Sequence, residues 1–342
     1  MRAERPLINR SNPILVLGAG SWGTALALVL ARNKQKTLLW AHDAGHLQQM
    51  ESERCNARYF PNIPFPDDLQ ICVSLKTAST VQDILLAIPC VGFRQILEKI
   101  KPHIHKNSRI AWATKGLEPG TGKLLHEVAR EVLGETIPLA VLSGPTFAGE
   151  VAQGLPTAIT LAATDESFAA QLVERLHQPS FRVYTSSDII GAEVGGAVKN
   201  VLAIATGIAD GLGLGANTRA ALITRGLSEL MRLGTKLGAQ QETLMGLTGV
   251  GDVILTCTDD QSRNRRFGLS MARGHSVQDA LNEIGQAVEG VKGAKEITGK
   301  AHQLGIEMPI CEQIYQVVYE NLSPGDAAQA LLRRSPKSEV AT

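Results

Sequence analysis

The sequence is poor in aromatic residues and has almost no excess of either charge. Phe, Trp and Tyr make up 4% of its 342 residues, too few for the stacked aromatic platforms that bind single-stranded nucleic acid. Lys and Arg number 34 against 33 for Asp and Glu, which gives a formal net charge of +1. This balance argues against a broadly basic nucleic-acid or membrane-surface protein but leaves room for a local basic pocket.

Paired cysteines and long hydrophobic runs are also missing. The five cysteines are never spaced as Cys-x-x-Cys, which predicts neither a disulfide framework nor a zinc site, and we expect no bound metal. The charged N-terminus leads into no apolar signal core. The longest apolar stretch, 191–216, is interrupted by Glu193, Lys199 and Asp210, so we expect no membrane insertion. A cytoplasmic location is therefore the default expectation.

The first half of the chain alternates short apolar runs with amphipathic segments. Strands are expected at 14–17, 37–40, 84–88, 109–113, 139–142, 158–161 and 182–184, and helices at 24–33, 92–100, 123–133 and 166–177. Continuous apolar strands that alternate with helices indicate a mostly parallel sheet covered on both faces. Residues 1–188 are thus predicted to form a doubly wound, Rossmann-type α/β domain that binds a dinucleotide.

The second half has the residue spacing of helices. Val198, Val201, Leu202 and Ala205, for example, fall on one face of a helix. Glycines and prolines between such segments divide the region into several helices. We predict an all-α domain over 189–333, which holds the substrate and the catalytic residues, followed by a flexible tail over 334–342.

A glycine-rich motif, Gly18-Ala19-Gly20-Ser21-Trp22-Gly23, joins the first expected strand to the first expected helix. At such a turn Gly18 permits the tight bend, Gly20 lets the backbone approach a pyrophosphate, and Gly23 lets the helix pack close to the strand. The free N–H groups at the start of the helix attract the anion. A glycine-rich turn without a ligand is the alternative, but this position favours a nicotinamide dinucleotide site.

The end of the second expected strand bears on the choice between NAD and NADP. His42 lies where an adenosine 2′-phosphate would be, and Asp43 follows it. His42 would suit the 2′-phosphate of NADP, whereas Asp43 would accept a hydrogen bond from the 2′-hydroxyl of NAD. Two solvated loop residues are the third alternative, so both cofactors stay open.

Lys199 is the first catalytic candidate, because an ammonium group in an apolar helix is costly unless it has a partner. Gly195 and Gly196 precede it on the same face and predict that a nicotinamide ring or a small substrate approaches the backbone there. Desolvation would lower the pKa of Lys199 toward a value that suits a general base. Asp252, after a Gly-Val-Gly run, is a candidate partner. The alternatives are a lysine that snorkels at a helix edge and an aspartate that caps a helix.

Three further segments hold candidate substrate ligands. The run Ser262-Arg263-Asn264-Arg265-Arg266 places three guanidinium groups within four positions, which suits a phosphate, although a solvated helix face is the usual explanation. Lys115 follows an expected strand and so lies at the carboxyl edge of the sheet, where ligands bind in open α/β folds. Thr146, in Ser143-Gly144-Pro145-Thr146, follows another strand. An ordinary strand-to-helix turn is the alternative for both loops.

Six segments, in this order, resemble those of bacterial NAD(P)-dependent glycerol-3-phosphate dehydrogenases: G-A-G-S-W-G-T-A-L-A, A-T-K-G, S-G-P-T-F-A, G-G-A-V-K-N-V-L-A-I-A-T-G, G-D-V-I-L-T-C and S-R-N-R-R-F-G. The resemblance spans residues 13 to about 320. It implies the interconversion of dihydroxyacetone phosphate and sn-glycerol 3-phosphate with NAD or NADP. It also implies a homodimer that supplies glycerophospholipid synthesis.

The resemblance assigns roles residue by residue. Lys199 would accept the proton in the oxidation direction, with Asp252 as its partner. The substrate would be lined by Lys115, Gly144, Thr146, Lys199, Asp252, Ser262, Arg263 and Asn264. The cofactor would be held by Gly18, Gly20, Ser21, Trp22, Gly23, His42, Lys115, Ala148, Arg263 and Glu289. Glu289 is carried by the resemblance alone, and His42 at its position leans toward NADP.

Three other interpretations compete with this one. A 2-hydroxyacid or 6-phosphogluconate-type dehydrogenase also joins a dinucleotide domain to a helical domain with a similar lysine helix, but the Ser-Arg-Asn-Arg-Arg and Ser-Gly-Pro-Thr segments disfavour it. A nucleotide-sensing module would have no use for a tuned pair of Lys199 and Asp252. An interaction scaffold has no support from heptads, repeats or charged arms.

Overall fold

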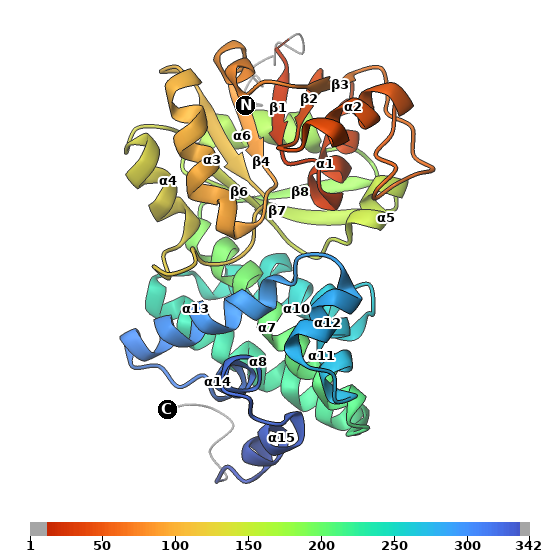
Figure 1. Cartoon of the computed structure of the whole chain (residues 1–342). Coiled ribbons are helices and arrows are strands. Elements are labelled where there is room, and N and C mark those ends of the chain that lie inside the picture. Colours follow the sequence, from red (N-terminus) through yellow and green to blue (C-terminus); the bar gives the residue numbers. More distant parts are fainter. Residues whose placement is uncertain (1–11, 336–342) are drawn as a thin grey trace.

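An eight-stranded sheet forms one half of the molecule and a bundle of helices forms the other (Figure 1). The computed structural model describes residues 12–335. The part of the predicted tail that follows residue 335 lies outside the described residues. Within the described residues, the predicted order of a Rossmann-type half followed by a helical half is confirmed.

The strands lie in the order β3-β2-β1-β4-β5-β6-β7-β8. Neighbouring strands are parallel except for β6 and β7, which are antiparallel. This arrangement agrees with the mostly parallel sheet that the apolar runs predict. The strands are β1 (Ile14–Leu17), β2 (Thr37–Trp40), β3 (Leu69–Cys72), β4 (Asp83–Leu86), β5 (Arg109–Trp112), β6 (Leu139–Ser143), β7 (Thr157–Ala163) and β8 (Phe181–Ser186).

Helices cover both faces of the sheet, as two separate apolar clusters show. One cluster joins the sheet to α1, α2, α5 and α6, and the other joins its opposite face to α3, α4 and the start of α7. These helices are α1 (Ser21–Arg32), α2 (Ala44–Glu53), α3 (Phe93–Ile100), α4 (Leu125–Leu133), α5 (Ala148–Gln153) and α6 (Glu166–Leu176). The six helices on the two faces leave the carboxyl ends of the central strands open. These ends face the helical half.

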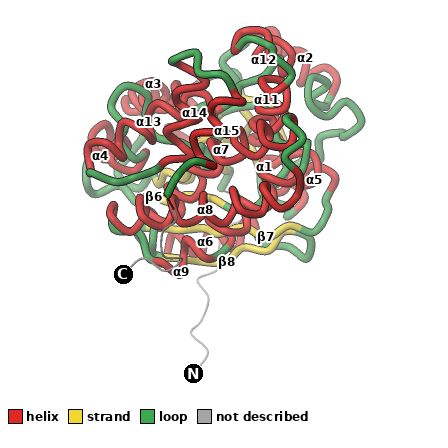
Figure 2. The backbone as a smooth tube through the Cα atoms, turned by 90° about the horizontal axis from the view of Figure 1, so that it is seen from below, coloured by secondary structure: helices red, strands yellow, loops and turns green. Residues whose placement is uncertain are grey.

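The helical half is organised around one long buried helix, α7 (Ile189–Gly211), which lies near the middle of the view in Figure 2. Around it are α8 (Gly215–Leu237), α9 (Gln241–Met245), α10 (Asp252–Thr258), α11 (Arg263–Ala272), α12 (Val277–Ile284), α13 (Glu289–Leu304), α14 (Pro309–Tyr319) and α15 (Pro324–Leu332). In the described residues, α7 alone is long and apolar enough to span a membrane, but 94% of its apolar window is buried inside the protein, as in a core helix.

Two glycines let α7 and α11 approach each other closely. A Cβ atom at Gly207 would lie 2.1 Å from the carbonyl oxygen of Arg265, and one at Gly268 would lie 2.2 Å from that of Ile204. Because a real Cβ atom cannot approach a carbonyl so closely, only glycine fits at either position. The close crossing fixes the start of α11 beside α7.

The predicted domain boundaries, 1–188 and 189–333, stay a prediction. The last strand ends at Ser186 and α7 begins at Ile189. However, Ile189 and Ala192 of α7 pack into the apolar cluster of the sheet. The first turns of α7 thus belong to the packing of both halves.

Candidate active site

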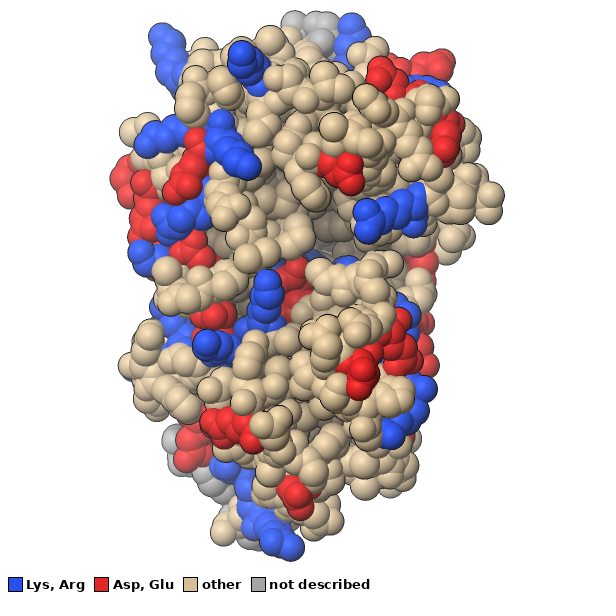
Figure 3. Space-filling view, viewed as in Figure 1, with Lys and Arg blue, Asp and Glu red and all other residues tan. Residues whose placement is uncertain are grey.

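A cleft of about 900 Å³ lies between the sheet and the helical half. Figure 3 shows the molecular surface hollowed at mid-height, between the two halves. The cleft is lined by the start of α1, by the loops that follow β4, β5 and β6, and by residues of α7, α10, α11 and the segment that leads into α13. The sheet thus contributes its carboxyl edge, where ligands bind in open α/β folds.

The glycine motif between β1 and α1 has the geometry that a dinucleotide loop needs. Gly18 has a φ of +117°, and a Cβ atom there would lie 2.4 Å from the carbonyl oxygen of Ala87. A Cβ atom at Gly23 would lie 1.8 Å from the carbonyl oxygen of Gly18, so the helix can pack against the turn only through glycine. A Cβ atom at Gly20 would meet nothing within 4 Å, and Gly20 lines the cleft. The backbone at Gly20 is therefore open to a ligand.

The start of α1 offers hydrogen-bond donors to the cleft. Gly20 is the N-cap residue, and no side chain caps the helix. Ser21 and Trp22, in the first turn, line the cleft. The indole Nε1 of Trp22 is buried and has no hydrogen-bond partner among residues 12–335. Free N–H groups at the positive end of a helix suit the pyrophosphate of a dinucleotide.

The two candidates for the adenosine ribose lie at the end of β2. His42 is exposed and is not part of the cleft lining. Asp43 is the N-cap residue of α2, where its carboxylate accepts the backbone N–H of His46 at 3.1 Å. This hydrogen bond is the main cause that lowers the pKa of Asp43. Asp43 thus caps α2 through Oδ1, and both His42 and Asp43 are exposed at this end of β2.

A buried carboxylate bridges two lysines that line the cleft. The ammonium group of Lys199, on α7, donates to Asp252 Oδ1 at 2.6 Å and to the Thr256 hydroxyl at 2.9 Å. Lys115, in the loop after β5, donates to Asp252 Oδ2 at 2.6 Å and to the carbonyl oxygen of Gly144 at 3.0 Å. Asp252 is fully buried and so does not face solvent, and it does not cap α10, whose N-cap residue is Gly251. Lys199 is 7% exposed, which excludes a snorkelling side chain.

This cluster shifts the proton affinity of Lys199. Burial lowers its pKa from 10.5 to about 8, because the charged form loses hydration; Asp252 opposes this change, and the positive charge of Lys115 supports it. A lysine with such a pKa exists in both protonation states near neutral pH. It can therefore donate a proton as well as accept one.

The two glycines before Lys199 lie close to other protein atoms. A Cβ atom at Gly195 would lie 2.4 Å from the carbonyl oxygen of Thr248, and one at Gly196 would lie 3.2 Å from Cγ of Lys115. These protein neighbours explain both glycines, so the approach of a ligand to the backbone of α7 here stays a prediction. The glycines make room for the Lys115 side chain and for the turn before α10.

The arginine-rich segment divides between the cleft and the core. Arg263 and Arg266 line the cleft, and Arg263 donates to the side-chain oxygen of Gln286 at 3.4 Å. Burial lowers the pKa of Arg263, with Glu289 acting in the opposite direction. Arg265 points away and forms ion pairs with Asp210 and Asp260. The expected group of three arginines is thus wrong for Arg265, because this side chain stabilises the packing of α11 against the end of α7.

Ser262 and Asn264, the other candidates in this segment, have structural partners as well. Ser262 is the N-cap residue of α11. The amide nitrogen of Asn264 donates to Asn200 Oδ1 at 2.9 Å, and its oxygen accepts the backbone N–H of Gly290 at 2.9 Å. Both residues nevertheless line the cleft. Of the hydrogen-bonding groups of the Asn264 amide, one N–H remains available to a ligand.

Most of the predicted site residues meet at the cleft. Those that line it are Gly20, Ser21, Trp22, Lys115, Thr146, Ala148, Lys199, Ser262, Arg263, Asn264 and Glu289. Gly18, Gly23, His42, Gly144 and Asp252 are not in the lining. Sequence reasoning missed Arg58, Tyr59, Asn200, Thr256 and Gln286, which also line it. The sequence could have indicated two of these residues. Asn200 directly follows the candidate Lys199, and Thr256 lies four residues, about one helical turn, after the candidate Asp252. In residues 12–335, no cluster of three or more His, Cys, Asp or Glu could hold a metal ion.

A Rossmann-type half with an open helix start, facing a buried lysine–aspartate pair on a helical half, is typical of nicotinamide-dependent dehydrogenases. Family models described as the N-terminus and the C-terminus of NAD-dependent glycerol-3-phosphate dehydrogenase match residues 13–169 and 188–329. Both matches together cover most of the chain. The chain therefore belongs to the NAD-dependent glycerol-3-phosphate dehydrogenase family, and the resemblance found in the sequence is confirmed.

Individual relatives agree with this assignment. A glycerol-3-phosphate dehydrogenase [NAD(P)+] of Nitrosococcus oceani is 57% identical over 328 residues, which cover 96% of this chain and 95% of the relative. One of Aeromonas salmonicida is 56% identical over 328 residues, covering 95% of this chain and 98% of the relative. The crystal structure of a glycerol-3-phosphate dehydrogenase from Coxiella burnetii is 51% identical, has a TM-score of 0.93, and covers 95% of this chain and 100% of its own.

Proposed function

We propose that this protein transfers a hydride between NAD(P)H and dihydroxyacetone phosphate to give sn-glycerol 3-phosphate, and that Lys199 transfers the proton. In the reductive direction, one hydride and one proton reach the carbonyl carbon and oxygen of the substrate, and NAD(P)+ is released. The observation that carries the proposal is that Lys199, paired with the buried Asp252, lines the same cleft as the open start of α1. Family membership supports the choice of substrate.

The start of α1 is the proposed site of the cofactor pyrophosphate. Gly20 leaves space, and the backbone N–H groups of Ser21 and Trp22 lie at the positive end of the helix. The nicotinamide cofactor, when bound, supplies the hydride chemistry. Ala148 and Glu289 line the same cleft and are proposed to contact the cofactor. His42 is proposed to favour the 2′-phosphate of NADP.

Lys199 is proposed as the general acid in reduction and the general base in oxidation. As an ammonium group it donates its proton to the carbonyl oxygen of dihydroxyacetone phosphate; as an amine it takes the proton of the C2 hydroxyl of glycerol 3-phosphate. Burial and the nearby Lys115 hold its pKa low enough for both tasks. Thr256, which accepts a second hydrogen bond from Lys199 at 2.9 Å, fixes the direction of the ammonium group.

Asp252 and Lys115 are proposed to position Lys199 and the substrate. Asp252 holds one lysine on each carboxylate oxygen, and the carbonyl oxygen of Gly144 holds Lys115 from the loop after β6. The cluster thus joins the strand-end loops to α7 and α10, so the proton-transfer group has a defined place relative to the cofactor site. Such fixed positions supply much of the rate of a two-substrate reaction.

Arg263 is proposed to bind the phosphate of the substrate. It lines the cleft at the start of α11, where the helix N-terminus adds a positive dipole to the guanidinium charge. Ser262, Asn264 and Thr146 lie in the same lining and are proposed as further contacts. Binding energy from this remote phosphate orients the carbon that reacts.

The cellular setting is proposed from the family. We propose that the protein works as a cytoplasmic homodimer and supplies glycerol 3-phosphate for glycerophospholipid synthesis, with dihydroxyacetone phosphate reduced in the physiological direction. Sedimentation of the purified chain tests the dimer independently of activity.

The proposed reaction is tested by the absorbance of the reduced nicotinamide. We expect purified protein to oxidise NADPH or NADH rapidly with dihydroxyacetone phosphate, and to be at least about 100-fold slower, in kcat/KM, with unphosphorylated dihydroxyacetone, because the charge-assisted phosphate contacts are worth several kcal/mol together. Comparing NADPH with NADH shows the cofactor preference that His42 would set. Turnover of an unphosphorylated 2-oxo acid in place of the phosphate ester would contradict the proposal and favour a 2-hydroxyacid dehydrogenase.

A further inference from the structure

Glu193 is a buried carboxylate of α7 that the proposed reaction does not use. Its side chain is 2% exposed and lies six residues before Lys199 on the same helix. Both of its oxygens have partners on α4, in the Rossmann-type half. Oε1 accepts the backbone N–H of His126 at 2.9 Å, and Oε2 lies 2.6 Å from Nδ1 of the His126 ring. One side chain therefore joins the helix of Lys199 to a helix of the other half.

The contact is favourable for α4 as well as for Glu193. His126 is the second residue of α4, so its backbone N–H is one of the groups at a helix start that have no partner within the helix. A carboxylate at this end also meets the positive end of the helix dipole. Burial disfavours the charged form of His126, but the hydrogen bond to Glu193 and the charge of that carboxylate together raise the pKa of His126. Burial likewise raises the pKa of Glu193.

Glu193 and Asn200 are seven residues apart, two helical turns on one face of α7. Asn200 accepts from Asn264, which in turn accepts from the backbone of Gly290, so this second anchor lies within the helical half. Lys199 lies between the two anchors in the sequence. The contacts of Glu193 hold α7 against the Rossmann-type half, and the contacts of Asn200 hold it against α11 and α13.

The position of α7 matters because the lysine cluster also joins the two halves. Lys199 reaches Asp252 from α7, whereas Lys115 reaches the other oxygen of Asp252 from the loop after β5. Gly196 leaves only 3.2 Å between its missing Cβ position and the Lys115 side chain. A small shift of α7 would therefore change the distance of Lys199 from Asp252 and its approach to Lys115 together.

We infer that Glu193 is a positioning residue. Through its contacts with His126 it fixes the position of α7 relative to the Rossmann-type half, and hence the position of the Lys199 ammonium group. This inference rests on the proposed role of Lys199. Displacement of a reacting group by about 1 Å can cost roughly 100-fold in rate, so loss of this contact acts on catalysis as well as on stability.

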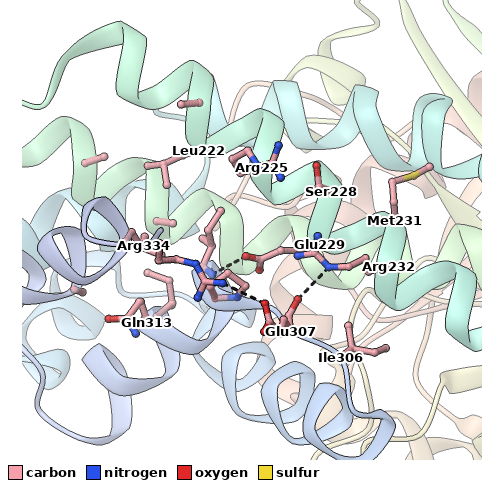
Figure 4. A pocket seen from close by; sticks show the side chains of 18 of the residues that line it. Leu222, Arg225, Ser228, Glu229, Met231, Arg232, Ile306, Glu307, Gln313 and Arg334 are labelled. Carbon is pink, nitrogen blue, oxygen red and sulfur yellow. Dashed lines mark hydrogen bonds and ion pairs between the residues drawn. The ribbon is translucent and has the colours of Figure 1, made fainter. Parts of the chain in front are cut away.

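The test compares Glu193→Gln and Glu193→Ala with a matched control, Glu229→Gln. Glu229, on α8, is also a buried carboxylate that caps another helix, since it accepts the backbone N–H groups of Ile310 at 2.6 Å and Cys311 at 3.2 Å at the start of α14. It lies in the groove along α8 that Figure 4 shows, away from the cleft. Glu229→Gln thus also alters a buried carboxylate that caps a helix, but on α8 and not on α7, which carries Lys199.

We expect Glu193→Gln to lower kcat by about tenfold, with a shift in the pH dependence of glycerol 3-phosphate oxidation, because the environment of Lys199 changes. Glu193→Ala should lower kcat further, since glutamine keeps one acceptor for the N–H of His126. The KM of the cofactor should stay within about twofold. Glu229→Gln should lower the thermal midpoint by a similar amount but leave kcat and the pH profile as in the wild type.

The inference is overturned if the glutamine variant at position 193 loses thermal stability with an unchanged kcat and pH profile, as the control does. Should Glu193→Ala fail to fold, the glutamine variant decides alone. An inactive wild-type protein would instead contradict the proposed function, so the two failures are distinguishable.

Discussion

Lys199→Ala should lower kcat roughly 10²–10⁴-fold, the usual contribution of a positioned general acid or base. The affinity for NADPH should not change, because the proposed pyrophosphate site at the start of α1 belongs to the Rossmann-type half, whereas Lys199 lies on α7. Asp252 would keep its ion pair with Lys115, which limits the cost of leaving that carboxylate buried. Steady-state rates and fluorescence titration with NADPH measure the two effects separately.

Two controls accompany this variant. Lys199→Met keeps the aliphatic length of the side chain, so it should be as inactive as the alanine variant if the ammonium group is what matters. Lys236→Ala removes an exposed lysine of α8, outside the cleft, and should keep the wild-type rate. A Lys199→Ala enzyme with nearly normal kcat would remove Lys199 from the mechanism.

Arg263→Ala should raise the KM of dihydroxyacetone phosphate by roughly 10- to 150-fold, as expected for the loss of about 1.5–3 kcal/mol from a hydrogen bond to a charged group. The KM of unphosphorylated dihydroxyacetone should not change, since that molecule lacks the group that Arg263 would hold. The matched control is Arg273→Ala, because Arg273 follows the last turn of the same helix and lies outside the cleft. An unchanged KM in the Arg263 variant would remove the phosphate assignment.

The strands of the Rossmann-type half show what a single sequence can predict. The bounds of β1 (Ile14–Leu17) and β2 (Thr37–Trp40) agree with the prediction, because buried parallel strands read as continuous apolar runs between turns. The edge strand β3 (Leu69–Cys72) was missed, since its second residue, Gln70, is exposed and breaks the run. An edge strand with one solvated face has too few apolar residues to stand out from the loops beside it.

The sequence predicted the site residues whose burial would cost free energy unless they had a partner. A lysine in an apolar helix pointed to Lys199, and the structure places the predicted partner, Asp252, 2.6 Å from it. Where several partners would satisfy the same requirement, the sequence could not choose. The glycines before Lys199 accommodate Lys115 and Thr248, and Arg265 pairs with Asp210 and Asp260. These outcomes depend on tertiary packing, which spacing along the chain does not reveal.

Lys115 shows the same limit of sequence-based prediction, because its position was predicted but its partner was not. Its place after a strand predicted a position at the sheet edge, which the structure shows. Nothing in the spacing indicated that it would share Asp252 with Lys199 across 137 residues of chain. Burial lowers the pKa of Lys199, and the nearby charge of Lys115 adds to this effect. The proximity of the two lysines became visible only with the fold.

The most direct test of Lys199 as the proton-transfer group is the pH dependence of kcat/KM for glycerol 3-phosphate oxidation. Because oxidation needs the neutral amine and burial lowers the pKa of Lys199 to about 8, the rate should rise about tenfold per pH unit below that value and level off above it. In reduction, which needs the ammonium form, kcat/KM should fall as the pH rises through the same value. A profile that stays flat in both directions from about pH 7 to 9 would contradict the account.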